Sequence, residues 1–210
     1  MRRDWITRYA LSMGVAVPFL YYGSQAAAAP FFPGFSFLGT TASELGSDLS
    51  RHPAIFNDGS ILQGIACLIA SFGFLLALGR LSVHPLLAWP TFLAIAIGGC
   101  ASLWAGYYPL PDPRHGGHPA FLIALLALPV LFTLVLWRGG HVGLRTYLIA
   151  NLLLLAAMFP IMSGMSGLDT HTYRGLFQRL FAFTVFPPIA VAGFVLARRL
   201  PGERILKTNS

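Results

Sequence analysis

Six long apolar runs alternate with polar segments along the chain, and each run holds 18 or more residues. A helix needs about 20 mostly apolar residues to cross a hydrocarbon core about 30 Å thick. The pattern therefore predicts an all-α, polytopic membrane bundle, formed as a single domain by residues 1–210. The expected transmembrane helices are residues 8–29, 60–79, 86–106, 119–137, 146–163 and 178–197.

Composition supports a membrane protein. Hydrophobic residues make up 56% of the chain and charged residues only 10%, whereas about 25% charged is usual in soluble domains. The formal net charge of +7 comes from basic residues that mostly flank the apolar runs, as topology signals do. The bilayer is thus the expected partner, and nucleic acid is not.

The first apolar run also resembles a signal peptide, because MRRDWITR precedes it and SQAAAAP follows it. The run is long for the apolar part of a signal peptide. We therefore expect a helix that is retained.

The basic residues divide unequally between the two sides of the predicted bundle. With a cytoplasmic N-terminus, the inner segments hold Arg2, Arg3, Arg8, Arg80, Arg138, Arg145, Arg198, Arg199, Arg204 and Lys207. The outer segments hold Arg51, Arg114, Arg174 and Arg179. The positive-inside bias therefore places both termini in the cytoplasm. Most acids and histidines then lie outside, so any site is expected to be extracytoplasmic.

The first outer loop contains SELGSDLSRHPAIFNDG, residues 43–59, an unusually polar segment for this chain. Loops of about thirty residues are usually functional or disordered. Ser43, Glu44 and Asn57 are therefore candidate ligand-binding residues. The alternative is that Ser43 or Ser47 caps a short helix whose positive end favours the nearby acid.

The second outer loop, DPRHGGH, offers candidate zinc ligands in Asp112, His115 and His118. A further ligand would have to come from another loop, because Pro113 and two glycines argue against one continuous helical face. The alternative is a polar turn in which His118 bonds a neighbouring loop. No cofactor is otherwise indicated.

Catalysis is a third hypothesis for the outer face. A nucleophile needs an adjacent base that is itself oriented by a third group, and Ser43 with His118 and either Glu44 or Asp112 supplies the residue types. Glu44, Asp112 and His118 are thus the candidate catalytic residues. The G-x-S-x-G motif is absent, so whether the protein is an enzyme stays open.

The third outer segment, GLDTHTYRGLFQR, places Arg179 at the start of the last apolar run. An arginine fork suits phosphate or carboxylate, so Arg179 is a candidate clamp for a lipid phosphate. The alternative is an ion pair with Glu44 or Asp58 that locks the loops together.

The interior of every apolar run lacks Asp, Glu, Lys, Arg and His, which disfavours a proton-driven pump or voltage sensor. Cys67 and Cys100 fall at similar depths on neighbouring helices, where free thiols are favoured over a disulfide. A small-residue ridge on the third run indicates close helix packing. Its members are Ala94, Gly98, Ser102 and Gly106.

The outer segments together resemble a known family. PGFSFLG, SELG and HPAIFNDGSILQG, then YYPLPDPRHGGHPAF, then GLFQR, are similar to landmarks of domain-of-unknown-function family 998. These are six-helix bacterial and archaeal membrane proteins, which implies a bacterial inner membrane. A more distant likeness is to the Frag1/DRAM/Sfk1 group, some of whose members act in lipid-anchor remodelling. The resemblance implicates Ser43, Glu44, Gly46, Pro53, Asn57, Gly59, His118, Gly175 and Arg179.

One position departs from the family pattern. Members often carry glutamate immediately before the arginine of the last landmark, whereas this chain has Gln178. Any mechanism that needs a carboxylate there is in doubt.

Two functional interpretations follow. In the first, the three outer segments converge in one polar pocket that binds or processes a lipid headgroup or another amphiphile. Its ligand-binding residues would be Ser43, Glu44, Asn57, His118 and Arg179. In the second, the polar cluster is structural, and the protein is an accessory or assembly subunit of a membrane complex or a homo-oligomer.

Overall fold

The computed structural model describes residues 2–81, 85–116, 118–138, 140–163 and 165–200, and within these ranges it is all-helical. The long helices are α1 (Arg2–Ala28), α2 (Ala54–Leu81), α3 (Ala88–Tyr107), α4 (Pro119–Leu136), α5 (Val142–Met162) and α6 (Arg174–Arg199). Three short 3-10 helices are η1 (Ala29–Phe31), η2 (Ser43–Gly46) and η3 (Pro85–Leu87). Each predicted apolar run therefore forms most of one long helix.

Several helices extend beyond the apolar runs that predicted them. α2 begins at Ala54 and α6 at Arg174, because a helix can continue past the membrane core into polar surroundings. Asn57 consequently lies in the first turn of α2, and Arg179 in the second turn of α6. Two landmark residues are thus presented on helices and not on flexible loops.

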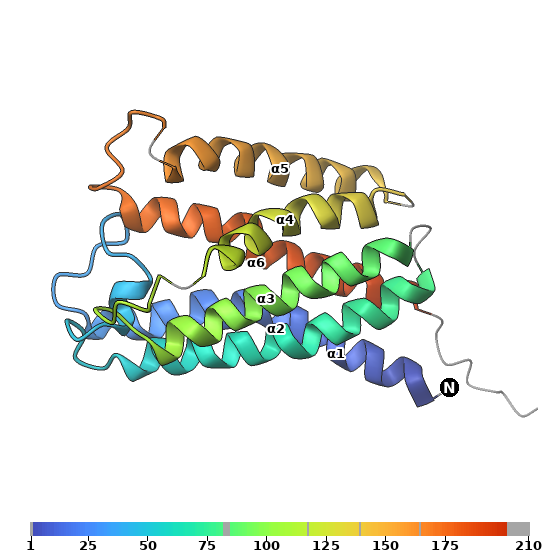
Figure 1. The fold of residues 1–210 in the computed structure, drawn as a ribbon, viewed down its shortest axis with the longest axis horizontal. Coiled ribbons are helices and arrows are strands. Elements are labelled where there is room, and N and C mark those ends of the chain that lie inside the picture. Colours follow the sequence, from blue (N-terminus) through green and yellow to red (C-terminus); the bar gives the residue numbers. More distant parts are fainter. Residues whose placement is uncertain (1, 82–84, 117, 139, 164, 201–210) are drawn as a thin grey trace, which may run out of the picture.

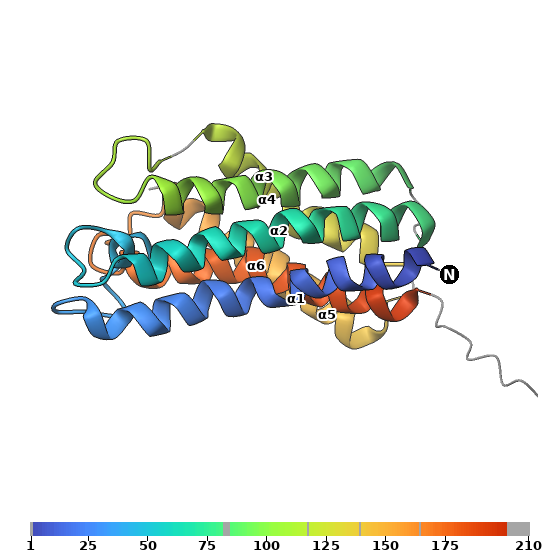
Figure 2. The ribbon, with the colours of Figure 1, turned by 90° about the horizontal axis from the view of Figure 1, so that it is seen from below.

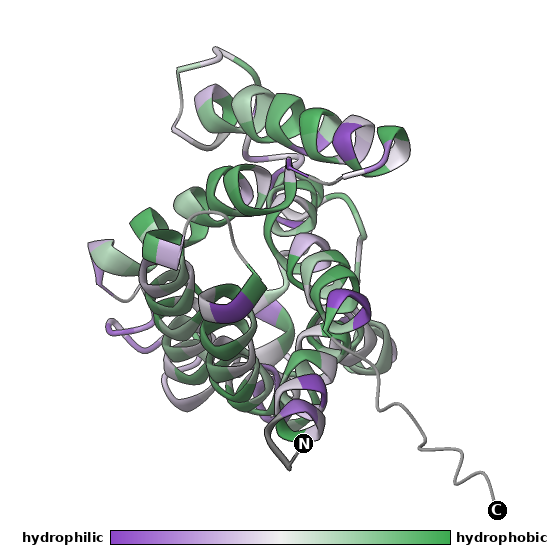
Figure 3. Ribbon diagram, turned by 90° about the vertical axis from the view of Figure 1, so that its right-hand side faces the viewer, coloured by the Kyte–Doolittle hydropathy of each residue, from purple (hydrophilic) through white to green (hydrophobic). Residues whose placement is uncertain are grey.

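Five of the helical segments are long and apolar enough to cross a membrane: Ala54–Leu81, Pro85–Tyr107, Pro119–Leu136, Val142–Ile161 and Arg174–Arg199. The chain is therefore a multi-pass membrane protein. Helix α1 has the length but is not among the five, since its C-terminal half mixes Pro18, Tyr21, Tyr22 and Gln25 with apolar residues. In Figure 3 most residues of the helices are coloured as hydrophobic.

Helix α2 lies side by side with α1 and α3, as Figures 1 and 2 both show. α6 packs against α1, α2, α4 and α5. α5 is peripheral, and its contacts are with α4 and α6 (Figure 1). α2 and α6 contribute the most residues to the buried hydrophobic core, with smaller contributions from the other long helices.

The two ends of the bundle differ in structure. The long connections, residues 29–53, 108–118 and 163–173, gather at one end, which we call the loop end (Figure 1). The start of α1, the end of α6, η3 and the α4–α5 turn lie at the opposite end (Figure 1). The three landmark segments thus share one end, as the sequence predicted.

Close contact between α2 and α3 depends on glycine. A Cβ added at Gly64 would lie 2.6 Å from Leu103 Cγ and 2.7 Å from the Gly99 carbonyl oxygen. Both distances are shorter than side-chain carbons tolerate. The small residue at this position sets how near the two helix backbones can come.

We expect Gly64→Ala to destabilise the bundle, because the added methyl overpacks the α2–α3 interface at a cost of about 1–3 kcal/mol. The measurement is the thermal unfolding midpoint in mild detergent. Gly79→Ala is the matched control, since nothing lies within 4 Å of its added Cβ. Equal midpoints for the two variants would contradict the packing argument.

Candidate functional site

Arg179 fixes the loop of residues 29–53 to the bundle. Its Nη1 donates to the backbone carbonyls of Phe37, at 2.9 Å, and of Thr40, at 2.8 Å. Its guanidinium also lies 4.8 Å from the centroid of the Phe37 ring, within the range of a cation–π interaction. The residue is only 5% exposed. Arg179 is therefore directed at the loop backbone.

The ion pair predicted for Arg179 is made by a different arginine. Arg174 Nη2 lies 2.7 Å from Glu44 Oε1, and Arg174 Nε donates to the Gly39 carbonyl at 3.1 Å. The other carboxylate oxygen of Glu44 accepts from the backbone N–H of Thr41 at 2.7 Å and from its hydroxyl at 2.8 Å. Glu44 thus joins η2 to the start of α6 and organises its own loop.

Gln178 supplies the next contact between this loop and α6. Its Oε1 accepts from the backbone N–H of Ala42 at 2.6 Å. This role needs an acceptor oxygen, which an amide and a carboxylate both provide. The departure from the family's glutamate therefore preserves the contact without the charge.

Asn57 ties the same loop to α2. Its Nδ2 donates to the Gly46 carbonyl at the end of η2, at 2.9 Å. Its neighbour Asp58 is exposed. Together we call Glu44, Asn57, Arg174, Gln178 and Arg179 the latch, because their side chains hold residues 37–46 across the ends of α2 and α6.

Gly175 allows the loop to approach α6. A Cβ at this position would collide with the Thr40 carbonyl oxygen and would lie 2.8 Å from Arg179 Nη1. The glycine–x–x–x–arginine spacing therefore has a geometric reason, since Gly175 admits the carbonyl that Arg179 binds.

Beneath the latch lies a cavity of about 480 Å³, which we call the axial pocket. Ala42 and Ser43 of the loop line it at the top, and Phe181 and Val185 of α6 line it further along the helix. The volume falls within the 300–1,000 Å³ typical of ligand pockets. Its remaining lining residues come from α1, α2, α3, α4 and the loop before α4, and α5 contributes none.

The polar side chains of the axial pocket are uncharged: Tyr21, Ser43, Ser60, Gln63, Ser102 and Gln178. Ser60 donates to the Ser102 carbonyl at 2.8 Å. Gln63 differs from the others, because it is 1% exposed and nothing in the described residues accepts a hydrogen bond from its Nε2. An unpaired buried amide costs about 1–3 kcal/mol, so a polar partner from a ligand would stabilise it.

His118 and the DPRHGGH loop take a different role from the latch. His118 is exposed and caps α4, its Nδ1 accepting from the Ala120 N–H at 3.2 Å. His115 Nδ1 lies 2.7 Å from the Tyr108 carbonyl oxygen. Among the described residues of this loop, Gly116 lines the axial pocket. The loop therefore contributes backbone atoms to the pocket wall.

Asp112 pairs within its own loop. Its carboxylate accepts from Arg114 Nη2 at 2.7 Å and from Arg114 Nε at 3.0 Å. These bonds favour the ionised form and lower the pKa of Asp112 to about 2. Within the described ranges no group of three His, Cys, Asp or Glu side chains could hold a metal ion. The arrangement of Asp112, His115 and His118 is that of a self-bonded polar turn.

The cysteines and the small-residue ridge have structural roles. Cys67 is buried, Cys100 is exposed, and both are free thiols, as predicted.

The four ridge residues of α3 are buried, and an added Cβ at Gly106 would lie 2.8 Å from the Asn57 carbonyl oxygen. The ridge is therefore used for packing inside this chain.

Comparison with known proteins gives a family. The model of DUF998, described as a protein of unknown function, matches residues 15–195. The chain therefore belongs to this family, and the resemblance found in the sequence is confirmed. No curated protein and no solved structure matches the chain. The likeness to the Frag1/DRAM/Sfk1 group stays a prediction.

We expect Asn57→Ala to loosen the loop, because it leaves the buried Gly46 carbonyl without its donor at a cost of about 1–3 kcal/mol. The measurement is the rate of limited proteolysis within residues 29–53. Asp58→Ala is the matched control, since this adjacent exposed side chain is outside the latch. Equal cleavage rates in the two variants would show that Asn57 does not hold the loop.

Proposed function

We propose that this protein binds an amphiphile in the axial pocket, with a polar but uncharged group of the ligand at Gln63 and an apolar portion against Phe181 and Val185. The observation that carries the proposal is the unpaired, buried amide of Gln63 in the wall of a cavity of about 480 Å³. Cavities with apolar walls and a few polar groups are the usual form of a small-molecule site.

The depth of the pocket suits a chain-like ligand. On α6 its lining runs from Gln178 to Phe186, which at 1.5 Å per residue is about 12 Å along the helix axis. Polar and apolar side chains both line the pocket along its depth, since on α2 the apolar Phe56 lies nearer the latch than the polar Gln63. A ligand that carries a polar group on an apolar body matches such a lining.

The chemistry of the pocket favours an uncharged polar group over a phosphate. Arg179 is not among the lining residues. Its Nη1 is bonded to two loop carbonyls, and its Nη2, which is buried without a partner among the described residues, belongs to a residue outside the pocket wall. Gln63 can donate and accept, so an ester or amide carbonyl or a hydroxyl would satisfy it. A lipid that enters by its glycerol ester or by an amide group is the ligand class we favour.

We propose binding without catalysis as the simpler function of this pocket. Ser43 lines it, but His118 is exposed and its ring nitrogen is engaged in capping α4. Glu44 is engaged by Arg174 and Thr41. Glu44 and the Nδ1 of His118 thus have partners other than Ser43, which supports binding over hydrolysis.

A role as accessory or assembly subunit remains the second candidate. The observation in its favour is the paired, closed latch. The small-residue ridge on α3, which could have formed an exposed packing surface, is buried. This surface therefore does not add support for a partner helix.

We further propose that the loop end faces away from the cytoplasm of a bacterial inner membrane, with α1 as a sixth span and both termini cytoplasmic. The unequal division of basic residues supports this orientation. Helix α1 spans 27 residues, about 40 Å at 1.5 Å per residue. That length exceeds a hydrocarbon core of about 30 Å.

Cysteine accessibility tests the orientation. In a variant lacking native thiols, we expect Ser163→Cys at the loop end to react with a membrane-impermeant maleimide in intact cells. Val142→Cys at the opposite end should react only after the cells are permeabilised. Both residues are exposed, so the reverse labelling pattern would overturn the proposed orientation.

Native mass spectrometry in mild detergent tests the ligand. We expect a lipid adduct on wild type and about tenfold weaker retention in Gln63→Leu, as removal of one buried amide contact implies. Ala101→Phe should also lose the adduct by filling the pocket. Asn151→Leu is the matched control, because its buried amide bonds the Thr184 carbonyl outside the pocket.

Either of two results would refute the proposal. One is the absence of any adduct on wild type, and the other is an adduct that both pocket variants retain. The unfolding midpoint of each variant, measured alongside, shows that a lost adduct does not reflect a lost fold.

A further inference from the structure

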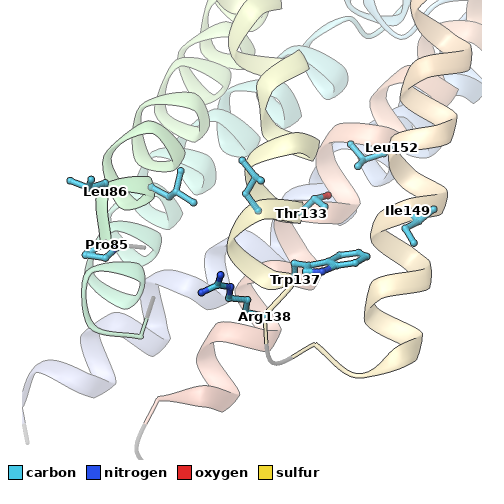
Figure 4. A pocket seen from close by; sticks show the side chains of 9 residues that line it. Pro85, Leu86, Thr133, Trp137, Arg138, Ile149 and Leu152 are labelled. Carbon is cyan, nitrogen blue, oxygen red and sulfur yellow. The ribbon is translucent and has the colours of Figure 1, made fainter. Parts of the chain in front are cut away.

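A second hollow lies at the opposite end of the bundle, distant in sequence from every latch residue. It has a volume of about 950 Å³ and is lined by η3, the end of α4 and the middle of α5 (Figure 4). We call it the α4 groove. Its lining is almost wholly apolar, with Arg138 and Thr133 as the polar exceptions.

The α4 groove opens to the outside of the bundle. Leu86 at one wall is 86% exposed, and Leu134, Trp137 and Ile149 are exposed as well. Thr133 is internally satisfied, since its hydroxyl donates to the Pro129 carbonyl at 2.8 Å. In a multi-pass membrane protein such a surface faces lipid, and hydrocarbon is the chemistry that fills it.

One cation at the groove has no partner. Arg138 follows the end of α4 and lines the groove, and among the described residues no side chain or carbonyl pairs with its exposed guanidinium. The acid described at this end, Asp4, is paired with Arg80 at 2.7 Å. The protein thus leaves a positive charge beside an apolar hollow without neutralising it.

Aromatic and basic groups adjoin Arg138. Arg145 Nε donates to the Trp137 carbonyl at 3.3 Å, and its guanidinium lies 5.4 Å from the centroid of the Trp137 ring. Tryptophan favours the depth of lipid headgroups. Basic pockets between transmembrane helices are suited to anionic headgroups. The depth, the charge and the apolar walls therefore point to one class of occupant.

We propose that the α4 groove binds an anionic phospholipid, with an acyl chain along α4 between η3 and α5 and the phosphate at Arg138. Basic residues near span ends often act only as topology signals, and a charge alone would not distinguish the two roles. What distinguishes this one is its place in the wall of an open apolar groove. The site is independent of the axial pocket and uses none of its residues.

Fluorescence quenching by lipids with brominated acyl chains tests the site, because Trp137 lines the groove. We expect phosphatidylglycerol to quench wild-type protein at about fivefold lower concentration than phosphatidylcholine, as one arginine contributes about that factor. Trp137→Phe should remove the saturable part of the quenching.

Two further variants separate charge from shape. Arg138→Gln should abolish the preference for phosphatidylglycerol while leaving the response to phosphatidylcholine unchanged. Ile149→Phe should weaken quenching by both lipids, because the larger side chain fills the groove. Arg114→Gln is the matched control, since this exposed arginine lies at the loop end, and it should behave as wild type.

Three results would overturn the proposal: equal quenching of wild type by the two lipids, an unchanged preference in Arg138→Gln, or saturable quenching that survives in Trp137→Phe. The last would show that the lipid binds near another tryptophan. None of these results bears on the adduct at Gln63, so the two proposals can fail separately.

Discussion

The bonds from Arg179 to two backbone carbonyls are the constraint on which the loop end depends. Irregular backbone beside a membrane must have its polar groups satisfied, and the Phe37 and Thr40 carbonyls belong to such a segment. A buried guanidinium without a carboxylate is costly to desolvate. Charge-assisted hydrogen bonds of about 1.5–3 kcal/mol each offset that cost, and the Phe37 ring adds a cation–π contribution.

The other latch contacts build on this one and differ from it in strength. The Glu44–Arg174 pair is partly exposed, and exposed ion pairs contribute at most about 1 kcal/mol. Ala42 and Ser43 lie between the latch contacts and also line the axial pocket. The position of the loop therefore sets the mouth of the pocket. Loss of the Glu44–Arg174 pair alone would therefore cost little stability, while Arg179 still bonds the loop backbone.

The fold was largely predictable from the sequence. The length of each apolar run, compared with the thickness of the membrane, is enough to place each long helix along the chain. The pairing within the site was not. Glu44 meets Arg174 and not Arg179, since Arg179 binds carbonyl groups, and carbonyls are present at every residue and give no pattern to read. The path of the loop backbone decides which arginine reaches the carboxylate. Gln63 was visible as a lone amide in an apolar run, but the cavity beside it depends on five helices at once.

The two ends of the molecule consequently present different chemistry to the membrane. At the loop end Glu44, Arg174 and Arg179 are held in the latch, and the pocket beneath is lined by neutral polar side chains. At the opposite end Arg138 remains unpaired beside an apolar groove. A charge that is buried and bonded to the loop backbone organises structure, whereas an exposed charge left unpaired at a hollow is available to a ligand. By that distinction Arg179, the most conspicuous arginine in the sequence, serves the fold, and Arg138, which the sequence presents only as a topology signal, is the one suited to bind a phosphate.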